Sequence, residues 1–250
     1  MLEPAPLVAG LPWTGWAVVV LVALLVGFAK TALGGLGMVA AALMALVIPA
    51  KDSTGAVLLL LITGDVVAIW AYRRHADFRV IGRLLAPVLC GVALGAVFLT
   101  SVGDDAVRRT IGAILLALLV LNLWRDRLRT DTRLATVGYG GLAGFTTMVA
   151  NAGGPPMSLY LLGSHFEKWR FLGTTAWFFF TVNVIKLPVA VGVGIVGTDT
   201  VALWAVLAPV VLVGTWIGRR VIGRIDQRLF ERLVTGFVAV AALNLLLVPA

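Results

Sequence analysis

Charge is scarce in this 250-residue sequence, in which only 13% of the residues are Asp, Glu, Lys or Arg. An ordinary globular domain carries about 25% charged residues, so the composition argues against a soluble domain of the usual kind. Cysteine is nearly absent as well, because Cys90 stands alone and can form no intrachain disulfide. No Lys or Arg precedes the first apolar stretch, so we expect a retained helix there and not a cleavable signal peptide.

Motifs for catalysis and for cofactors are also missing. The sequence has no Ser-His-Asp arrangement, Walker loop or dinucleotide fingerprint in a suitable context, and His75 and His165 have no partners at metal-ligand spacing. We therefore expect no enzyme, no cofactor and no metal. The net charge of +8 does not indicate a nucleic-acid partner, because the arginines lie in short loops between apolar runs.

Apolar residues make up 60% of the chain, and its mean hydropathy is +1.03. They form ten runs, at residues 11–28, 36–50, 55–72, 84–103, 110–124, 134–150, 152–163, 171–197, 201–218 and 233–250. Most approach the ~20 residues with which a helix spans a bilayer, which predicts an all-α polytopic membrane protein. Runs 36–50 and 152–163 are too short, and each follows a break rich in glycine.

The two halves of the chain resemble each other. The matched segments are Gly27-Phe28 with Gly144-Phe145, residues 62–65 with 180–183, residues 85–87 with 207–209, and residues 121–123 with 243–245. Their offsets run from 117 to 122 residues in a constant order, which favours an internal duplication over chance similarity.

Positive charges decide between two topologies, since Lys and Arg prefer cytoplasmic loops. In the first topology, runs 11–28 and 36–50 form one crossing and runs 134–150 and 152–163 form another. The resulting eight spans place eight positive residues on one side of the membrane and ten on the other. If each pair is a re-entrant hairpin, six spans remain and the division becomes fifteen against three. The second arrangement predicts two inverted repeats, with both termini outside.

Each predicted repeat is a broken helical hairpin followed by three transmembrane helices. The first covers residues 1–129, with a hairpin at 11–50 and helices at about 55–72, 84–103 and 106–124. The second covers residues 130–250, with a hairpin at 134–163 and helices at about 171–197, 201–218 and 230–248. Together they form one integral membrane domain.

Three charged residues lie inside apolar runs, where charge is costly and indicates function. Lys30 and Lys186 either attract an anion or serve as an ion-pair partner or a snorkelling side chain. Asp65 is either a proton carrier or the counter-ion of Lys30. Its counterpart in the second half is the uncharged Asn183.

The two glycine-rich breaks indicate a binding site. Non-helical backbone at membrane depth survives only beside protein or a polar cavity, and a half-helix that starts there directs free N–H groups at an anion. Pro155 and Pro156 fit the first turn of the returning helix. Close helix packing is the alternative use of these glycines.

The motifs at residues 27–35 (GFAKTALGG) and 144–156 (GFTTMVANAGGPP) resemble those of the TauE/SafE sulfite exporter family, also called the toluenesulfonate uptake permease family. The resemblance covers nearly the whole chain. It implies secondary transport of sulfite, organosulfonates or related anions across a bacterial inner membrane.

We therefore expect a secondary transporter of a small anion, sulfite or an organosulfonate, with its site between the hairpin tips. Protons are the coupling ion if Asp65 is a proton carrier, and the coupling ion stays open if Asp65 is the counter-ion of Lys30. The candidate binding residues are Lys30, Thr31, Gly34, Gly35, Gly37, Thr146, Thr147, Asn151, Gly153, Gly154, Asn183 and Lys186, with Asp65 for ion coupling. A passive anion channel and a non-transporting scaffold or assembly factor are the alternatives.

Overall fold

Helices joined by short connections make up the fold. A computed structural model describes residues 10–31, 36–123, 132–163, 167–221 and 227–248. The helices are α2 (Trp13–Thr31), α3 (Leu36–Val47), α4 (Ala50–Tyr72), α5 (Phe78–Ser101), α6 (Asp104–Leu123), α7 (Arg133–Ala150), α8 (Gly154–Gly163), α9 (Lys168–Gly192), α10 (Thr198–Val221) and α11 (Gln227–Leu247), with a 3-10 turn η1 at Arg73–His75. These ranges contain no strand, which confirms the all-α prediction.

Among the described residues, five helices are long and apolar enough to cross a bilayer. The candidate spans are Trp13–Lys30, Ala50–His75, Phe78–Ser101, Trp169–Gly192 and Thr198–Arg220. Four of them coincide with predicted spans, and the first, in α2, is an arm of a predicted hairpin. The other two predicted spans, in α6 and α11, are not among these five; α6 opens with the charged residues Asp104 and Asp105, and the described side chains of α11 give a shorter apolar helix, Val234–Leu247.

Charged side chains at the start of α6 form hydrogen bonds with backbone groups at the ends of two neighbouring helices. Both carboxylate oxygens of Asp104 accept hydrogen bonds, at 2.9 Å, from the backbone N–H groups of Ala50 and Lys51. Arg108 Nη1 donates to the carbonyl of Ala45 near the end of α3 (2.8 Å). Because Asp104 supplies acceptors that the first turn of a helix lacks, α4 begins at Ala50, earlier than the predicted residue 55.

Each hairpin packs one arm closely against a helix of the other half. A Cβ atom added at Gly27 in α2 would lie 2.0 Å from the carbonyl oxygen of Val211 in α10. A Cβ added at Gly144 in α7 would lie 2.0 Å from the carbonyl oxygen of Val88 in α5. Only glycine permits backbones to approach this closely, as at many helix contacts in membranes.

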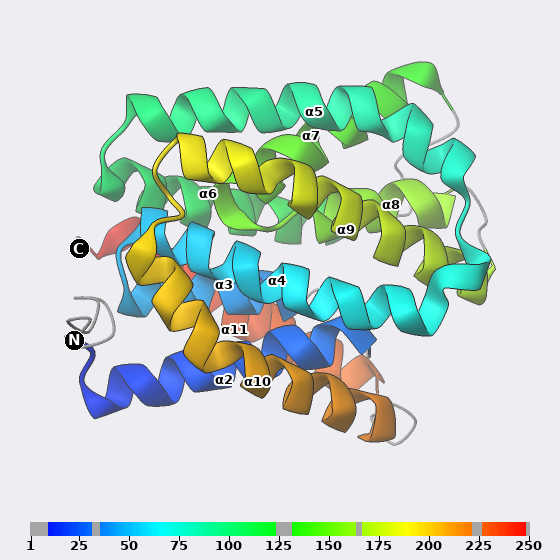
Figure 1. The fold of residues 1–250 in the computed structure, drawn as a ribbon. Coiled ribbons are helices and arrows are strands. Elements are labelled where there is room, and N and C mark those ends of the chain that lie inside the picture. The colour runs from blue at the N-terminus through cyan, green and yellow to red at the C-terminus, as the bar shows by residue number, and fades with distance from the viewer. Residues whose placement is uncertain (1–9, 32–35, 124–131, 164–166, 222–226, 249–250) are drawn as a thin grey trace.

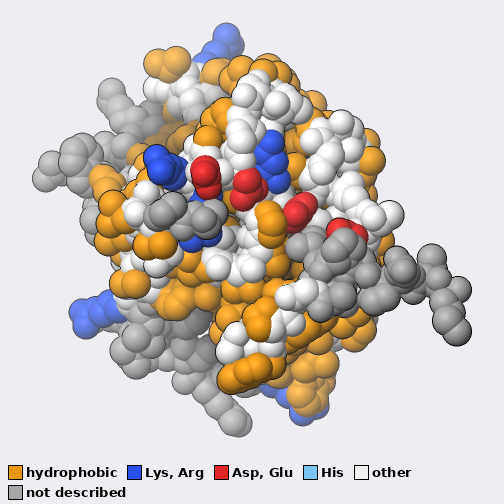
Figure 2. Space-filling model, turned by 90° about the vertical axis from the view of Figure 1, so that its left-hand side faces the viewer, with side chains coloured by type: hydrophobic (Ala, Val, Ile, Leu, Met, Phe, Trp, Pro, Cys, Tyr) orange, Lys and Arg blue, Asp and Glu red, His pale blue; other side chains and the backbone are white. Residues whose placement is uncertain are grey.

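The helices run between two ends of the molecule. In Figure 1, α2 begins and α11 ends at the left, while η1 and the starts of α5, α7 and α9 lie at the right. Figure 2 shows the left-hand end, where acidic and basic side chains gather near the centre. The described helices that start at this end carry the acidic residues Asp52, Asp104, Asp105 and Asp199 in their first turns.

At the opposite end, Asp77 joins α5 to α9. Its carboxylate accepts from the backbone N–H groups of Arg79 (3.0 Å) and Val80 (3.3 Å), which caps α5. It also forms an ion pair with Arg170 of α9. The hydrogen bond from Arg170 and, to a smaller extent, the two backbone hydrogen bonds hold the pKa of Asp77 below its ordinary value.

Candidate functional site

The break between α7 and α8 centres on Asn151. This residue ends α7 in the left-handed conformation (φ 50°, ψ 27°), and its N–H donates to the carbonyl of Thr147 (3.1 Å). Asparagine adopts this conformation more readily than most residues, and it commonly terminates helices in this way. Helix α8 then starts at Gly154, so Pro155 and Pro156 lie in its first turn, as predicted.

The side chain of Asn151 connects three elements. Its Nδ2 donates to the carbonyl of Thr54 in α4 (2.8 Å), and its Oδ1 accepts from Lys186 Nζ in α9 (2.9 Å). Thr54 returns the contact, since its hydroxyl donates to the carbonyl of Val149 in α7 (2.8 Å). The tip of the second hairpin is therefore held by hydrogen bonds to α4 and α9.

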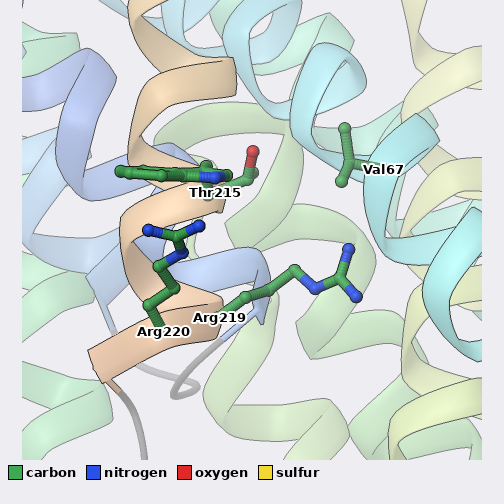
Figure 3. A pocket seen from close by; sticks show the side chains of 5 residues that line it. Val67, Thr215, Arg219 and Arg220 are labelled. Carbon is green, nitrogen blue, oxygen red and sulfur yellow. The ribbon is translucent and has the colours of Figure 1, made fainter.

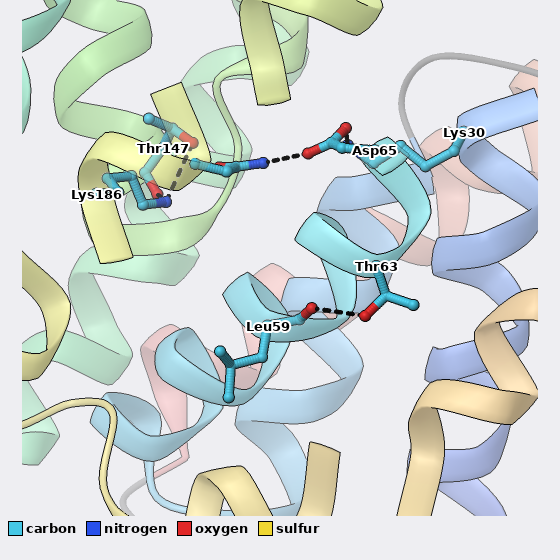
Figure 4. Close-up of polar contacts among 7 residues, drawn as sticks. Lys30, Leu59, Thr63, Asp65, Thr147 and Lys186 are labelled. Carbon is cyan, nitrogen blue, oxygen red and sulfur yellow. Dashed lines mark hydrogen bonds and ion pairs between the residues drawn. The ribbon is translucent and has the colours of Figure 1, made fainter. Parts of the chain in front are cut away.

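Lys186 is fully buried and is surrounded by neutral oxygens. Besides Asn151 Oδ1, its Nζ contacts the carbonyl oxygen of Thr147 at 2.5 Å and the Thr147 hydroxyl at 3.4 Å (Figure 4). An ammonium group has three N–H donors, so these three acceptors match the protonated form. Each acceptor is uncharged, which leaves the positive charge of Lys186 without a carboxylate partner among the described residues.

A second cluster contains the buried carboxylate of Asp65. Its Oδ1 lies 2.5 Å from Lys30 Nζ at the end of α2, and its Oδ2 accepts from Asn183 Nδ2 of α9 at 2.7 Å (Figure 4). Lys30 Nζ also lies 5.4 Å from the centre of the Phe179 ring. Lys30 is thus paired with Asp65 within this structure, which agrees with the ion-pair alternative for both residues.

The two clusters adjoin each other. Asn183 and Lys186 are three residues apart on α9, so their side chains lie on one face of that helix. Near the tip of the first hairpin, a Cβ added at Gly37 would lie 3.8 Å from the carbonyl oxygen of Asn151. The two hairpins therefore approach each other at Gly37 and Asn151.

Most of the candidate residues belong to these clusters. Thr146 donates to the carbonyls of Leu142 (2.7 Å) and Ala152 (3.2 Å), which supports the tip, and Gly153 packs against Thr147. A Cβ added at Gly154 would meet open space. Gly34 and Gly35 lie outside the described residues, and Thr31 is described only as the last residue of α2.

Thr54 and Phe179 were not predicted as site residues. Ser53 and Thr54 directly precede the apolar run 55–72, and this polar pair is the signal that the sequence offered. Phe179 belongs to an aromatic segment, residues 177–180. Its neighbour Phe178 is only 1% exposed, so Phe178 packs inside the protein and not against lipid.

A sequence model of the family described as sulfite exporter TauE/SafE matches residues 19–245. The chain belongs to the TauE/SafE sulfite exporter family. The match includes the second hairpin, the first hairpin from residue 19 onward, and the three charged residues Lys30, Asp65 and Lys186. No curated protein and no solved structure matches the chain in the two other comparisons.

Membership of the TauE/SafE family indicates a membrane transporter of sulfur-containing anions. Together with the apolar helices, it makes the chain an integral membrane protein. Members of this family are transporters and not enzymes. Transport and membrane insertion, as predicted from the sequence, agree with this assignment.

Proposed function

We propose that the chain is a secondary transporter of sulfite or a related organosulfonate, and that the anion binds beside Lys186 between the two hairpin tips. The observation that carries this proposal is the environment of Lys186, a buried cation surrounded only by neutral oxygens. A buried charge without a counter-charge is costly at membrane depth, so it marks a place where a mobile anion is stabilised.

The charges of the two clusters support an anion and not a cation as the substrate. Asp65 is compensated by Lys30 at 2.5 Å, so this pair is neutral. Lys186 therefore leaves a net charge of one positive unit in the described buried network. An anion that replaces the long contact from Nζ to the Thr147 hydroxyl, 3.4 Å, would neutralise this charge.

The tip of the second hairpin adds backbone groups to the site. Helix α8 begins at Gly154, whose N–H has no partner within the helix, and the helix dipole favours negative charge there. Pro155 and Pro156 have no N–H, and the Met157 N–H donates to the carbonyl of Gly153 (3.3 Å), so Gly154 supplies the backbone donor of this first turn. The open space at Gly154 leaves room for a small oxyanion to approach the backbone. Near the start of α3, a Cβ added at Gly37 would lie 3.8 Å from the carbonyl oxygen of Asn151, so the first hairpin approaches the second tip at Asn151.

Two pairs of glycine contacts support an inverted repeat, residues 1–129 and 130–250. In the first pair, Gly27 of α2 contacts the backbone of α10 at Val211, and Gly144 of α7 contacts the backbone of α5 at Val88. A Cβ at Gly55, near the start of α4, would lie 1.7 Å from the carbonyl oxygen of Ile195 after α9.

Gly173 completes the second pair. A Cβ at this residue, near the start of α9, would lie 2.7 Å from the backbone of His75 after α4. Such reciprocal contacts require α4 and α9 to be antiparallel, as inversion demands, and they favour alternating access by movement of one repeat against the other.

The orientation we propose places the chain termini outside the cytoplasm. The end shown in Figure 2 carries four described acidic residues, whereas η1 and the starts of α5 and α7 at the other end are rich in arginine. Positive loops favour the cytoplasmic side of a bacterial inner membrane. Proton coupling through Asp65 belongs to the same proposal, because a proton on this carboxylate would release Lys30.

Flux measured in proteoliposomes tests the proposed function. We expect sulfite to accumulate against its own gradient when a pH gradient is imposed. Passive equilibration of sulfite without a response to pH would instead establish a channel, and absence of any flux in correctly folded protein would favour a scaffold.

A further inference from the structure

A second positively charged feature lies away from the buried clusters, between α10 and α4. It is a pocket of about 420 Å³ lined by Val67, Thr215, Trp216, Arg219 and Arg220 (Figure 3). Val67 belongs to α4, and the other four residues belong to the last two turns of α10. The pocket therefore sits where the candidate span Thr198–Arg220 ends.

Aromatic rings hold both guanidinium groups. Arg220 Cζ lies 4.0 Å from the centre of the Trp216 ring, and Arg219 Cζ lies 5.7 Å from that of Trp70 on α4. Trp216 is 56% exposed and Trp70 is 64% exposed, so both rings face the surroundings of the protein. Exposed tryptophans at the end of a span are typical of the lipid headgroup region.

The two arginines have no acidic partner in the part of the chain that the structure describes. No described carboxylate neutralises the two guanidinium groups, so they are available to an anionic ligand, and the pocket wall formed by Val67 and Trp216 is apolar. A ligand that suits both features has a phosphate group next to a hydrocarbon chain. Small oxyanions satisfy the guanidinium groups but leave the apolar wall uncovered.

We propose that this pocket binds the phosphate of an anionic phospholipid, with Arg219 and Arg220 on the headgroup and the apolar wall against the start of an acyl chain. Anionic lipids are attracted to basic residues at the membrane surface, and arginine forms paired hydrogen bonds with phosphate oxygens. The proposal is independent of the transported anion, because it uses none of the residues around Lys186 or Asp65.

Lipid retention by the purified protein tests this site. The protein is reconstituted in vesicles of phosphatidylcholine with or without phosphatidylglycerol, and the phosphatidylglycerol that remains bound is quantified by native mass spectrometry. We expect Arg219→Gln/Arg220→Gln to weaken this binding roughly 30-fold, which is about 2 kcal/mol. A Val67→Glu variant, which places negative charge in the pocket, should weaken it as well.

Arg79→Gln/Arg83→Gln is the matched control, because these exposed arginines lie one turn apart on α5 at the same end of the molecule but outside the pocket. It should retain wild-type binding of phosphatidylglycerol. Equal losses in both double variants would overturn the proposal in favour of a general surface charge. Displacement of phosphatidylglycerol by millimolar free sulfite or phosphate would overturn it in favour of a site for small anions.

Discussion

The two hairpin tips place positive charge in opposite ways. At the first tip the cation is Lys30 on the hairpin, and α4 supplies the carboxylate of Asp65 at 2.5 Å. At the second tip the hairpin supplies only neutral oxygens, and the cation is Lys186 on α9. Under the proposed function the two tips serve different purposes: the ion pair at the first tip stabilises the contact between elements, whereas the second tip retains a charge for the anion.

The largest expected effect concerns the neutral tip. Lys30→Met leaves Asp65 buried without its cation and should cost about 3 kcal/mol of stability. Asp65→Asn should cost less, because the remaining Lys30 side chain is 13% exposed and can reach a more polar environment. Thermal unfolding in detergent measures both changes.

The double variant Lys30→Met/Asp65→Asn provides the control for this pair. It removes both charges and should recover most of the stability lost in Lys30→Met. A double variant no more stable than Lys30→Met would show that the ion pair is not what stabilises the first tip.

The close helix crossings should give equal effects in the two halves. Gly27→Ala and Gly144→Ala each place a Cβ 2.0 Å from a carbonyl oxygen, so each should lower stability by about 1–3 kcal/mol. Gly138→Ala, on the same helix as Gly144 but with open space at its Cβ, is the control and should be neutral or stabilising. Strongly unequal losses at residues 27 and 144 would contradict the proposed repeat.

Asn151→Asp would make the second tip resemble the first. Lys186 Nζ lies 2.9 Å from the amide oxygen of Asn151. A carboxylate at this position would therefore form an ion pair with Lys186 and compete with the substrate for the ammonium group. We expect sulfite affinity to fall about tenfold, equivalent to about 1.4 kcal/mol. Asn151→Gly keeps the left-handed backbone and adds no charge, so it should bind sulfite more tightly than Asn151→Asp.

The smallest effect is expected at Asp77, which pairs with Arg170 outside the membrane. Because the folded state lowers the pKa of Asp77, this carboxylate contributes stability above its unfolded pKa of about 3.9, and the contribution is lost as the pH falls through the folded value. Asp77→Ala should lower stability by about 1 kcal/mol at pH 7 and by less at pH 3. An equal loss at both pH values would exclude an electrostatic origin.

Sequence patterns predicted the helical class, the return helix that starts near Pro155, and the residues of both clusters other than Thr54 and Phe179. The predictions of the return helix and of the clusters rest on strong signals, because charged residues and prolines are rare inside apolar runs. The sequence offered Asp65 as the counter-ion of Lys30, but it did not indicate the neutral partners of Lys186, because Thr147 and Asn151 lie 39 and 35 residues away from it along the chain. The early start of α4 escaped prediction because its cap, Asp104, is 54 residues away from Ala50.

The central claim is that Lys186 is the counter-charge of the transported anion, and the direct test is the sulfite Kd of purified protein by calorimetry. Lys186→Gln keeps a hydrogen-bond donor but loses the charge, so the account predicts roughly 10- to 100-fold weaker binding. Lys186→Arg and the neutral double variant Lys30→Met/Asp65→Asn should retain most of the affinity. Wild-type affinity in Lys186→Gln, with loss of binding in the double variant, would contradict the account.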